Sequence, residues 1–359
     1  MRARQAAGFS LIEAIVAVAI FMAAASVLFH FAATSQRIAR AQPDAADVNQ
    51  RVRVAAGVIA RDLLDAGAAD AHGQLGTLAN YFPPIVPART GAQSPDAELT
   101  AFRDRISITY VPAGGWRTEL AADMAGPIAD VPINTATVGC PSSGLCGFLQ
   151  GTRAAIINAT NLGSGYDVFS VTSALAGLGH GPPNPPFSQA YIRSSTAVVP
   201  VVQRVYYLDR SHNRLMVYDG FKSAFPLIDN VVDLEFGYFV DPHAASAAVP
   251  ADTSGNCAYT AGDPPVPLLA QLGTVTLAPV PLRQFTDGPY CGVFPNRFDA
   301  DLLRIRRVRV RLRVQAALQQ SRGSGIHYSN AGSADSELSM VRDFELTFET
   351  TPRNMHPTR

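Results

Sequence analysis

The sequence predicts an α+β protein in which a long N-terminal helix packs on an antiparallel β-sheet domain with long, disulfide-bearing loops. Three observations predict this class. An apolar run from Phe9 to Ala33 is long enough to span a membrane, and an amphipathic pattern continues it to residue 66. The remainder alternates between period-two apolar segments and loops rich in proline and glycine. We therefore expect a helix over 9–66, membrane-spanning in its first half, and a β-rich domain over 67–359.

The apolar run has the flanks of a single membrane span. Arg2 and Arg4 are the only charges before it, and Glu13 is the only acid within it. A helix of about 25 residues rises about 37 Å, enough to cross a bilayer. The two arginines favour a cytoplasmic N-terminus, so we expect the rest of the chain to lie on the other side of the membrane.

Three interpretations of this segment compete. A secretory signal would have a shorter apolar run followed by a small-residue cleavage site. A plain membrane anchor explains the length but leaves Glu13 in lipid, at a cost of about 2.5–3.5 kcal/mol. In the third, a leader over 1–8 is cut after Gly8, and the new α-amine of Phe9 pairs with Glu13 in a helix bundle.

The third interpretation matches a known pattern. The residues Gly8-Phe9-Ser10-Leu11-Ile12-Glu13 resemble the cleavage and methylation motif of type IV prepilins and of type II secretion pseudopilins. The resemblance implies that a prepilin peptidase cleaves between Gly8 and Phe9 and methylates Phe9. It also implies an inner-membrane protein whose large domain lies in the periplasm. We find no obvious structural use for Glu13 within one subunit. It could pair with the α-amine of its own chain, one helical turn away, but we expect it to pair with that of a neighbouring subunit during assembly.

The second half of the helix has one apolar face. Its residues recur at spacings of three and four: Val48, Val52, Ala55, Ile59 and Leu63. Arg61 and Asp62 fall mostly off this face, and Gly67 is a plausible end. We expect Pro43 to bend or interrupt the helix, because proline lacks the backbone N–H.

Period-two alternation predicts the strands. They are expected at 105–111, 166–172, 198–208, 214–220, 227–240, 307–314 and 344–349, with a polar hairpin turn over 210–213. In the strand over 307–314 we expect the apolar residues inward and the arginines at 307, 309, 311 and 313 outward. Because Glu345 and Glu349 line the last strand, we expect these two strands to be antiparallel neighbours.

The four cysteines lack a CxxC pair, which favours disulfides over zinc. Of three possible pairings, Cys140 with Cys146 and Cys257 with Cys291 closes the shortest loops; reduced thiols are the alternative. These pairs fall in two expected loop inserts, near 112–165 and 241–295.

The C-terminal half carries a second, looser resemblance. The segments VQRVYYLD, NRLMVYDG, LIDNVVDLEFGYFVD and VRDFELTFETTPRNM resemble PilW-type minor pilins, with Phe236-Gly237-Tyr238 and Asp241 in the expected order. This implies a subunit that helps to initiate a type IV pilus, sits at or near its tip, and assembles with other minor and major pilins. A J-like pseudopilin of type II secretion has a similar layout. A membrane-anchored periplasmic enzyme or binding protein is the third possibility.

The sequence shows no convincing catalytic pattern. It has no GxSxG, HExxH or phosphate-binding glycine loop, and its seven histidines are scattered, so we expect no enzyme, no metal and no cofactor. Asp252, Asn256 and Asp263 could offer oxygen ligands to calcium, but a solvated turn explains them better.

The charge balance argues against a nucleic-acid partner. The formal net charge is zero over 359 residues. The arginines at 304, 306, 307, 309, 311 and 313 could contact DNA phosphates, but no aromatic platform is interleaved with them. A solvent-facing strand is the better explanation.

Overall fold

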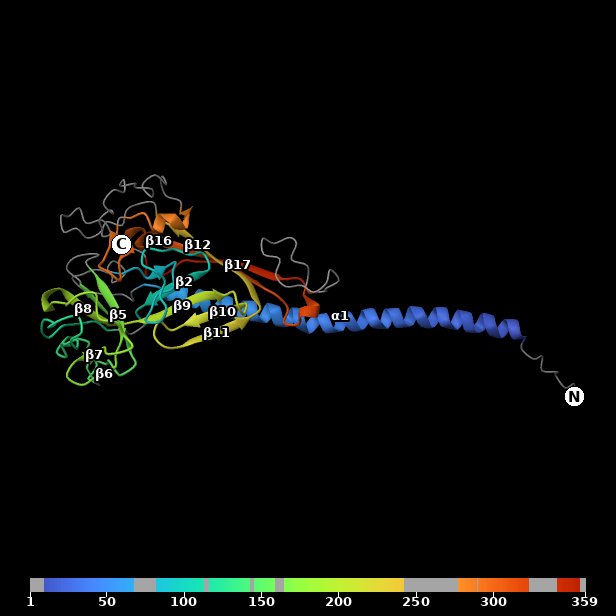
Figure 1. The fold of residues 1–359 in the computed structure, drawn as a ribbon, viewed down its shortest axis with the longest axis horizontal. Helices are drawn as coiled ribbons and strands as arrows, with labels where there is room; N and C mark the ends of the chain where they lie inside the picture. Colours follow the sequence, from blue (N-terminus) through green and yellow to red (C-terminus); the bar gives the residue numbers. More distant parts are fainter. Residues whose placement is uncertain are drawn as a thin grey trace. The chain divides into compact units, whose positions relative to one another are not determined.

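The computed structural model describes residues 10–67, 82–112, 116–142, 145–158, 165–241, 277–288, 290–322 and 341–355 (Figure 1). It divides into two compact units, residues 1–50 with 315–343 and residues 51–314 with 344–359, and each is described by itself. A long helix is followed by antiparallel sheets, so the predicted α+β class is confirmed.

Helix α1 covers Leu11–Asp65 without a break. Phe9, where we expected the helix to begin, lies outside the described residues. The interruption considered at Pro43 does not occur, because alanine-rich turns on both sides favour the helix and proline removes only one intrahelical hydrogen bond. After Asp65 the chain turns at Gly67, whose φ of 102° suits glycine.

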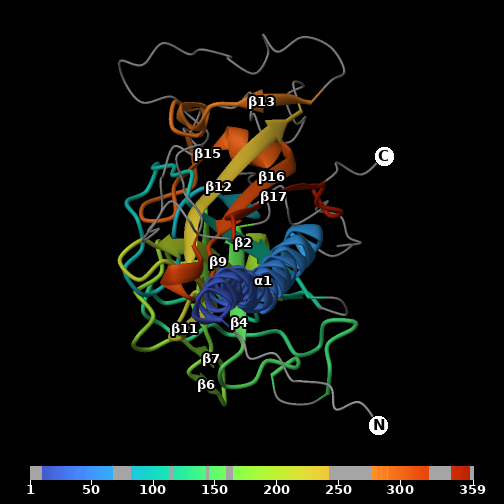
Figure 2. The same cartoon turned by 90° about the vertical axis from the view of Figure 1, so that its right-hand side faces the viewer.

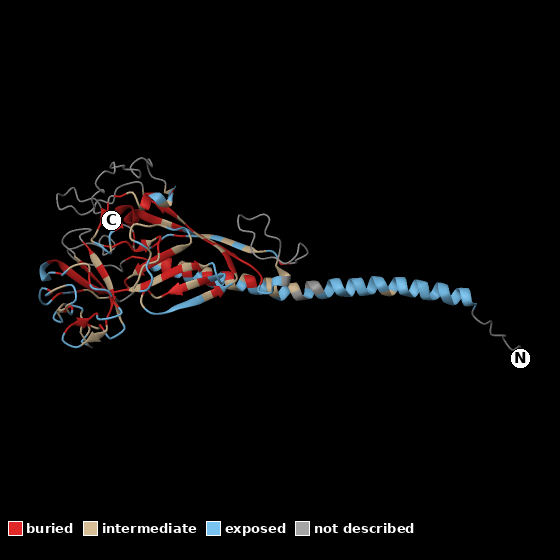
Figure 3. Cartoon of the chain, viewed as in Figure 1, coloured by how far each residue is buried: buried red, intermediate tan, exposed pale blue. Residues whose placement is uncertain are grey.

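The two halves of α1 differ in burial, as Figure 3 shows. From Leu11 to Gln36 every residue is exposed except the half-buried Ala25. The helix contains an 18-residue window of mean hydropathy 2.5, so by length and composition it can cross a membrane. The predicted apolar face of the second half is confirmed, since Val52, Ile59 and Leu63 are fully buried.

The larger unit holds a five-stranded antiparallel sheet in the order β1-β2-β9-β10-β11. Its strands are β1 (Ile85–Val86), β2 (Arg105–Tyr110), β9 (Val202–Asp209), β10 (Arg214–Tyr218) and β11 (Ala224–Asp229). The predicted hairpin is confirmed as β9 and β10, with Asn213 in the left-handed region at the turn. The end of α1 joins this sheet, because Gly67 donates to Thr109 O at 3.1 Å and accepts from Val111 N at 3.0 Å.

A second antiparallel sheet has the order β13-β12-β16-β17, and Figure 2 shows β12 beside β16. Its strands are β13 (Ala278–Val280), β12 (Val231–Val240), β16 (Ile305–Val314) and β17 (Phe344–Thr350). The predicted pairing of the arginine-lined and glutamate-lined strands is confirmed, with Arg309 opposite Glu349.

One outward arginine was predicted wrongly. Arg313 is only 1% exposed, whereas Arg309 on the same face is exposed. In register, Arg313 lies between Asp233 of β12 and Glu345 of β17. An acidic residue thus lies opposite the buried arginine on each neighbouring strand, which period-two alternation alone does not reveal.

Two predicted strands are each divided between sheets. The run 198–208 breaks after Pro200, giving β8 (Thr196–Pro200) in a third sheet and β9 in the first. The run 227–240 breaks at Asn230, which has a φ of 61° and separates β11 from β12. At Asn230 a left-handed residue interrupts the extended backbone, whereas after Pro200 the chain passes from the third sheet to the first within two residues.

The third sheet has the order β3-β8-β4-β5. It adds β3 (Thr118–Glu119), β4 (Arg153–Asn158) and β5 (Tyr166–Ser170). Both β3 and β4 fall within 112–165, which we expected to be a loop. In β4, apolar and polar residues do not alternate, because most of its residues are buried. The residues of this sheet contribute to two separate apolar clusters, one around Phe148 and Phe169 and one around Phe82.

The remaining elements are short. Two-stranded sheets form from β6 (Ser173–Ala174) with β7 (Leu178–Gly179), and from β14 (Tyr290–Cys291) with β15 (Phe298–Asp299). The 3₁₀ turns are η2 (Arg193–Ser195), η3 (Leu282–Phe285), η4 (Ala300–Arg304) and η5 (Gln319–Ser321). The described part of 241–295 thus includes β13, η3 and β14 rather than loop alone.

Candidate functional site

The first described residues form a capping box at the start of α1. The Glu13 backbone N–H donates to Ser10 Oγ at 3.3 Å, and the Ser10 backbone N–H donates to Glu13 Oε2 at 2.9 Å. This reciprocal arrangement satisfies two backbone N–H groups at the helix start that lack an intrahelical partner. Glu13 therefore has a structural use within one subunit, and the expectation that it has none was wrong.

The capping box leaves part of Glu13 available. Only Oε2 is hydrogen-bonded in the described part of the chain, and Oε1 has no partner there. A carboxylate can accept from several donors at once, so helix capping and pairing with an α-amine are compatible. Gly8 and Phe9, the residues of the predicted cleavage and methylation, lie outside the described residues.

A family model decides the nature of this segment. Residues 3–29 match the prokaryotic N-terminal methylation motif. The chain begins with the N-terminal segment of a type IV prepilin-like protein. Its motif implies processing by prepilin peptidase and assembly with other pilins, and the apolar half of α1 fits an inner-membrane anchor. No curated protein and no solved structure shows a significant match to this prepilin-like chain.

One predicted disulfide is present. Cys140 and Cys146 are bonded, with their Cα atoms 4.7 Å apart, in a loop beside Trp116 and Phe148. Cys291 is buried and also disulfide-bonded. Its predicted partner, Cys257, lies outside the described residues, so that pairing stays a prediction.

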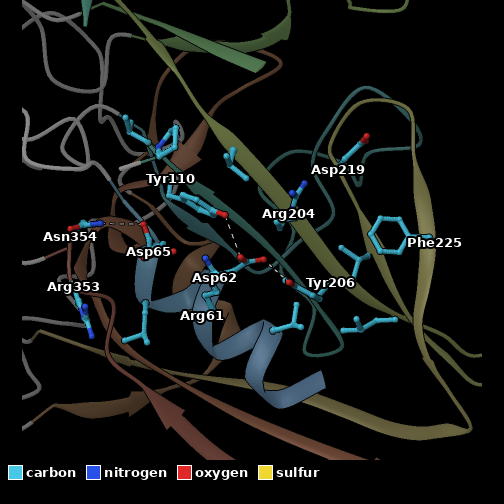
Figure 4. A pocket seen from close by; sticks show the side chains of 17 residues that line it. Arg61, Asp62, Asp65, Tyr110, Arg204, Tyr206, Asp219, Phe225, Arg353 and Asn354 are labelled. Atoms are coloured by element: carbon cyan, nitrogen blue, oxygen red, sulfur yellow. Dashed lines mark hydrogen bonds between the residues drawn. The ribbon is translucent and has the colours of Figure 1, made fainter. Parts of the chain in front are cut away.

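A cavity of about 950 Å³ opens where the end of α1 meets the five-stranded sheet (Figure 4). Its centre is Asp62, which is 8% exposed. The Tyr206 hydroxyl donates to Asp62 Oδ2 at 2.5 Å, and the Tyr110 hydroxyl donates to Oδ1 at 3.3 Å. Burial, and then the nearby Asp62 charge, raises the pKa of Tyr110 to about 12, so both hydroxyls remain donors at neutral pH.

Asp62 is the residue that sequence reasoning missed. It directly precedes the buried Leu63 and follows the buried Ile59 by three positions, which places it at the margin of the apolar face. The signal available in the sequence was an aspartate at the edge of the apolar helix face, together with Tyr110 and Tyr206 in two predicted strands. These hydrogen bonds connect the helix to β2 and β9, which identifies Asp62 as a helix anchor.

The arginine-rich strand is engaged within the fold. Arg307 and Arg309 both pair with Glu349, at 3.0 and 2.7 Å. Arg311 pairs with Glu235 and Asp233 of β12. Arg304 and Arg306 are buried, and burial lowers the pKa of each. These internal contacts support the structural interpretation of the strand over phosphate binding.

The described residues contain no group of three or more His, Cys, Asp or Glu placed to hold a metal ion. The calcium candidates Asp252, Asn256 and Asp263 lie outside the described residues. Among the histidines, His180 is buried: it is 5% exposed and stacks on Phe187 with ring centroids 3.7 Å apart.

Proposed function

We propose that the chain is a minor pilin of a type IV pilus, which helps to initiate assembly and sits at or near the filament tip. In this role prepilin peptidase cleaves between Gly8 and Phe9 and methylates Phe9. The observation that carries the proposal is the methylation motif at the start of a 55-residue helix whose apolar half is exposed. Exposed apolar surface of this size requires lipid or other helices around it.

The size of the exported domain supports a minor rather than a shaft subunit. Residues 67–359 follow the helix, and they form at least three sheets in the described part. A filament shaft repeats one subunit closely along its axis, and a bulky domain is easier to place at an end. The loose PilW-type resemblance in β9, β10, β12 and β17 points to the same role.

A J-like pseudopilin of type II secretion is the second candidate, because the methylation motif is shared by both kinds of prepilin. A periplasmic enzyme or binding protein fits the site less well. The central carboxylate of the α1 cavity, Asp62, is already bound by two tyrosine hydroxyls, an arrangement that anchors a helix. We therefore propose a structural role rather than an enzymatic one.

Deletion of the gene separates the two filament systems. We expect cells without the chain to lose surface pili while type II secretion continues, and a plasmid copy to restore piliation. In sheared filaments from wild-type cells, we expect the chain at a small fraction of the major subunit. Normal piliation with lost secretion would instead assign the chain to the pseudopilus, and no effect on either would contradict both assignments.

A further inference from the structure

The cavity beside α1 continues as a groove between the helix and strands β9, β10 and β11 of the five-stranded sheet. We call it the α1 groove; the residues used here are Val58 and Arg61 of α1, Arg204 and Tyr206 of β9, and Phe225 and Leu227 of β11. Tyr206, Val217 and Phe225 are cross-strand neighbours, so they form one row on the floor. Arg51 Nη1 donates to Asp229 O at 2.9 Å and ties the helix to β11.

The apolar part of the α1 groove is incompletely covered. Phe225 is 51% exposed, and Val58 on the helix is 37% exposed. Val54, one turn before Val58, is 50% exposed and extends the apolar stripe along the same side of the helix. Neighbouring apolar side chains that stay this accessible mark a surface for a partner more often than isolated ones do.

The charges of the α1 groove favour an acidic occupant. Arg204 is half-buried, and its one hydrogen bond in the described part of the chain is a long 3.4 Å contact to Gln203 O. Arg61 is exposed and has no ion pair among the described residues. A guanidinium has five N–H donors, so Arg204 retains most of its capacity for a carboxylate.

The acids of the α1 groove do not use this capacity. Asp62 is occupied by Tyr110 and Tyr206. Asp219 Oδ1 accepts backbone N–H groups from residues 221, 222 and 223. Asp65 remains at the rim, where it is exposed and without an ion pair in the described region. None of the three acids that line the cavity pairs with Arg204 in the described part of the chain, so its guanidinium is open to an incoming carboxylate.

The outer edge of β11 argues against recognition by strand addition. β11 is the last strand of its sheet, but Pro226 lies at its centre and cannot donate a backbone hydrogen bond. Recognition must then come from side chains. We propose that the α1 groove binds an acidic, partly apolar peptide segment of a co-assembling subunit, with its carboxylate on Arg204 and an apolar side chain against Phe225. The inference rests on the proposed function, which supplies that subunit.

Site-specific photocross-linking tests this inference in the full-length chain. Benzoylphenylalanine is introduced at position 225 in cells that produce all filament subunits, and cross-linked peptides are identified by mass spectrometry. We expect one subunit peptide that contains Asp or Glu close to the cross-linked residue. Arg204→Glu should reduce the cross-link yield about tenfold or more, the effect of losing a charge-assisted hydrogen bond.

The matched control is Lys222→Glu. Lys222 is an exposed cation in the turn between β10 and β11, contacts the ring of Phe221, and does not line the cavity. The substitution Lys222→Glu should leave the cross-link yield unchanged. Replacing the partner's acid by Arg should restore the cross-link to Arg204→Glu. If Arg204→Glu lowers the amount of folded chain, Arg204→Gln carries the test and should also reduce the yield.

The inference is wrong if Arg204→Glu leaves the cross-link yield unchanged, or if Lys222→Glu lowers the yield equally. It is also wrong if the label captures only lipid or a peptide without a nearby acid. Leader cleavage and co-purification with sheared filaments are measured in the same cells. A chain that is cleaved and incorporated but cross-links independently of Arg204 contradicts this inference alone. A chain that is neither cleaved nor incorporated contradicts the proposed function.

Discussion

At the scale of single residues, Ser10 and Glu13 have coupled but separable roles. The capping box uses hydrogen bonds that a neutral amide can also provide, whereas pairing with an α-amine requires the negative charge. An unperturbed α-amine has a pKa of about 7.7–8.0, so it is largely protonated at neutral pH and attracts a carboxylate. The two roles can therefore be tested by different substitutions.

Glu13→Gln should retain the cap but fail to enter the filament, because it removes the charge. Ser10→Ala should be incorporated, because it removes the cap side chain, at a cost of about 1 kcal/mol, and keeps the carboxylate. The measurement is the ratio of each variant in sheared filaments to its amount in the membrane. Equal incorporation of Glu13→Gln and wild type would show that Glu13 acts through capping alone.

Buried aspartates near η4 set a pH dependence of stability. Burial raises the pKa of Asp299 to about 8 and that of Asp301 to about 7. With an unfolded-state pKa of about 3.9, the folded state binds more protons between about pH 4 and 8. The contribution of these groups is present at low pH and is lost as the pH rises toward the folded pKa values.

We expect the free energy of unfolding of the full chain in detergent to fall from pH 5 to pH 8. The contribution of Asp299 to the slope is on the order of 1 kcal/mol per pH unit. Asp299→Asn should make the slope shallower. Asp209→Asn is the control, because hydrogen bonds from Ser211 and His212 hold the pKa of the half-buried Asp209 at about 2, outside the window. A slope that Asp299→Asn leaves unchanged would contradict the assignment.

At the scale of elements, the junction of α1 with β2 and β9 depends on a polar anchor within an apolar interface. Asp62 is buried, and its carboxylate is compensated by the hydroxyls of Tyr206 and Tyr110. Removing one donor leaves a buried acceptor partly unsatisfied, which costs more than the hydrogen bond contributes.

Tyr206→Phe should lower the free energy of unfolding by about 1–3 kcal/mol. Tyr207→Phe is the matched control, because the Tyr207 hydroxyl makes no hydrogen bond in the described part of the chain. The control should stay within about 0.5 kcal/mol of wild type. Chemical unfolding of the full chain followed by circular dichroism measures both, and equal effects of the two substitutions would rule out the anchor.

At the scale of the whole molecule, periodicity predicted the elements whose two faces differ. The buried stripe from Val48 to Leu63 and the alternation over residues 307–312 of β16 were confirmed, because in both cases one side is more exposed than the other. β4 was missed because both of its faces are covered, which removes alternation. The breaks after Pro200 and at Asn230 were missed because the apolar pattern continues through them.

The candidate sites also differ in how far the sequence predicts them. The methylation motif occupies one short stretch of the chain, so Gly8, Phe9 and Glu13 can be recognised from the sequence alone. The cavity at the end of α1 unites α1, β2, β9, β10 and β11, and no local pattern predicts that Asp62 meets Tyr206, which is 144 positions away. The buried Arg313 is a similar case, because its acidic neighbours come from two other strands.

The central claim is that the chain is processed and assembled as a prepilin, and the N-terminus of the mature protein tests it most directly. Mass spectrometry of the membrane-extracted chain should show Phe9 as the first residue, carrying a methylated α-amine. Gly8→Arg should leave the precursor inserted but uncut. An intact Met1 in the wild-type chain, or a cut beyond Ala33 as in a secretory signal, would contradict the account.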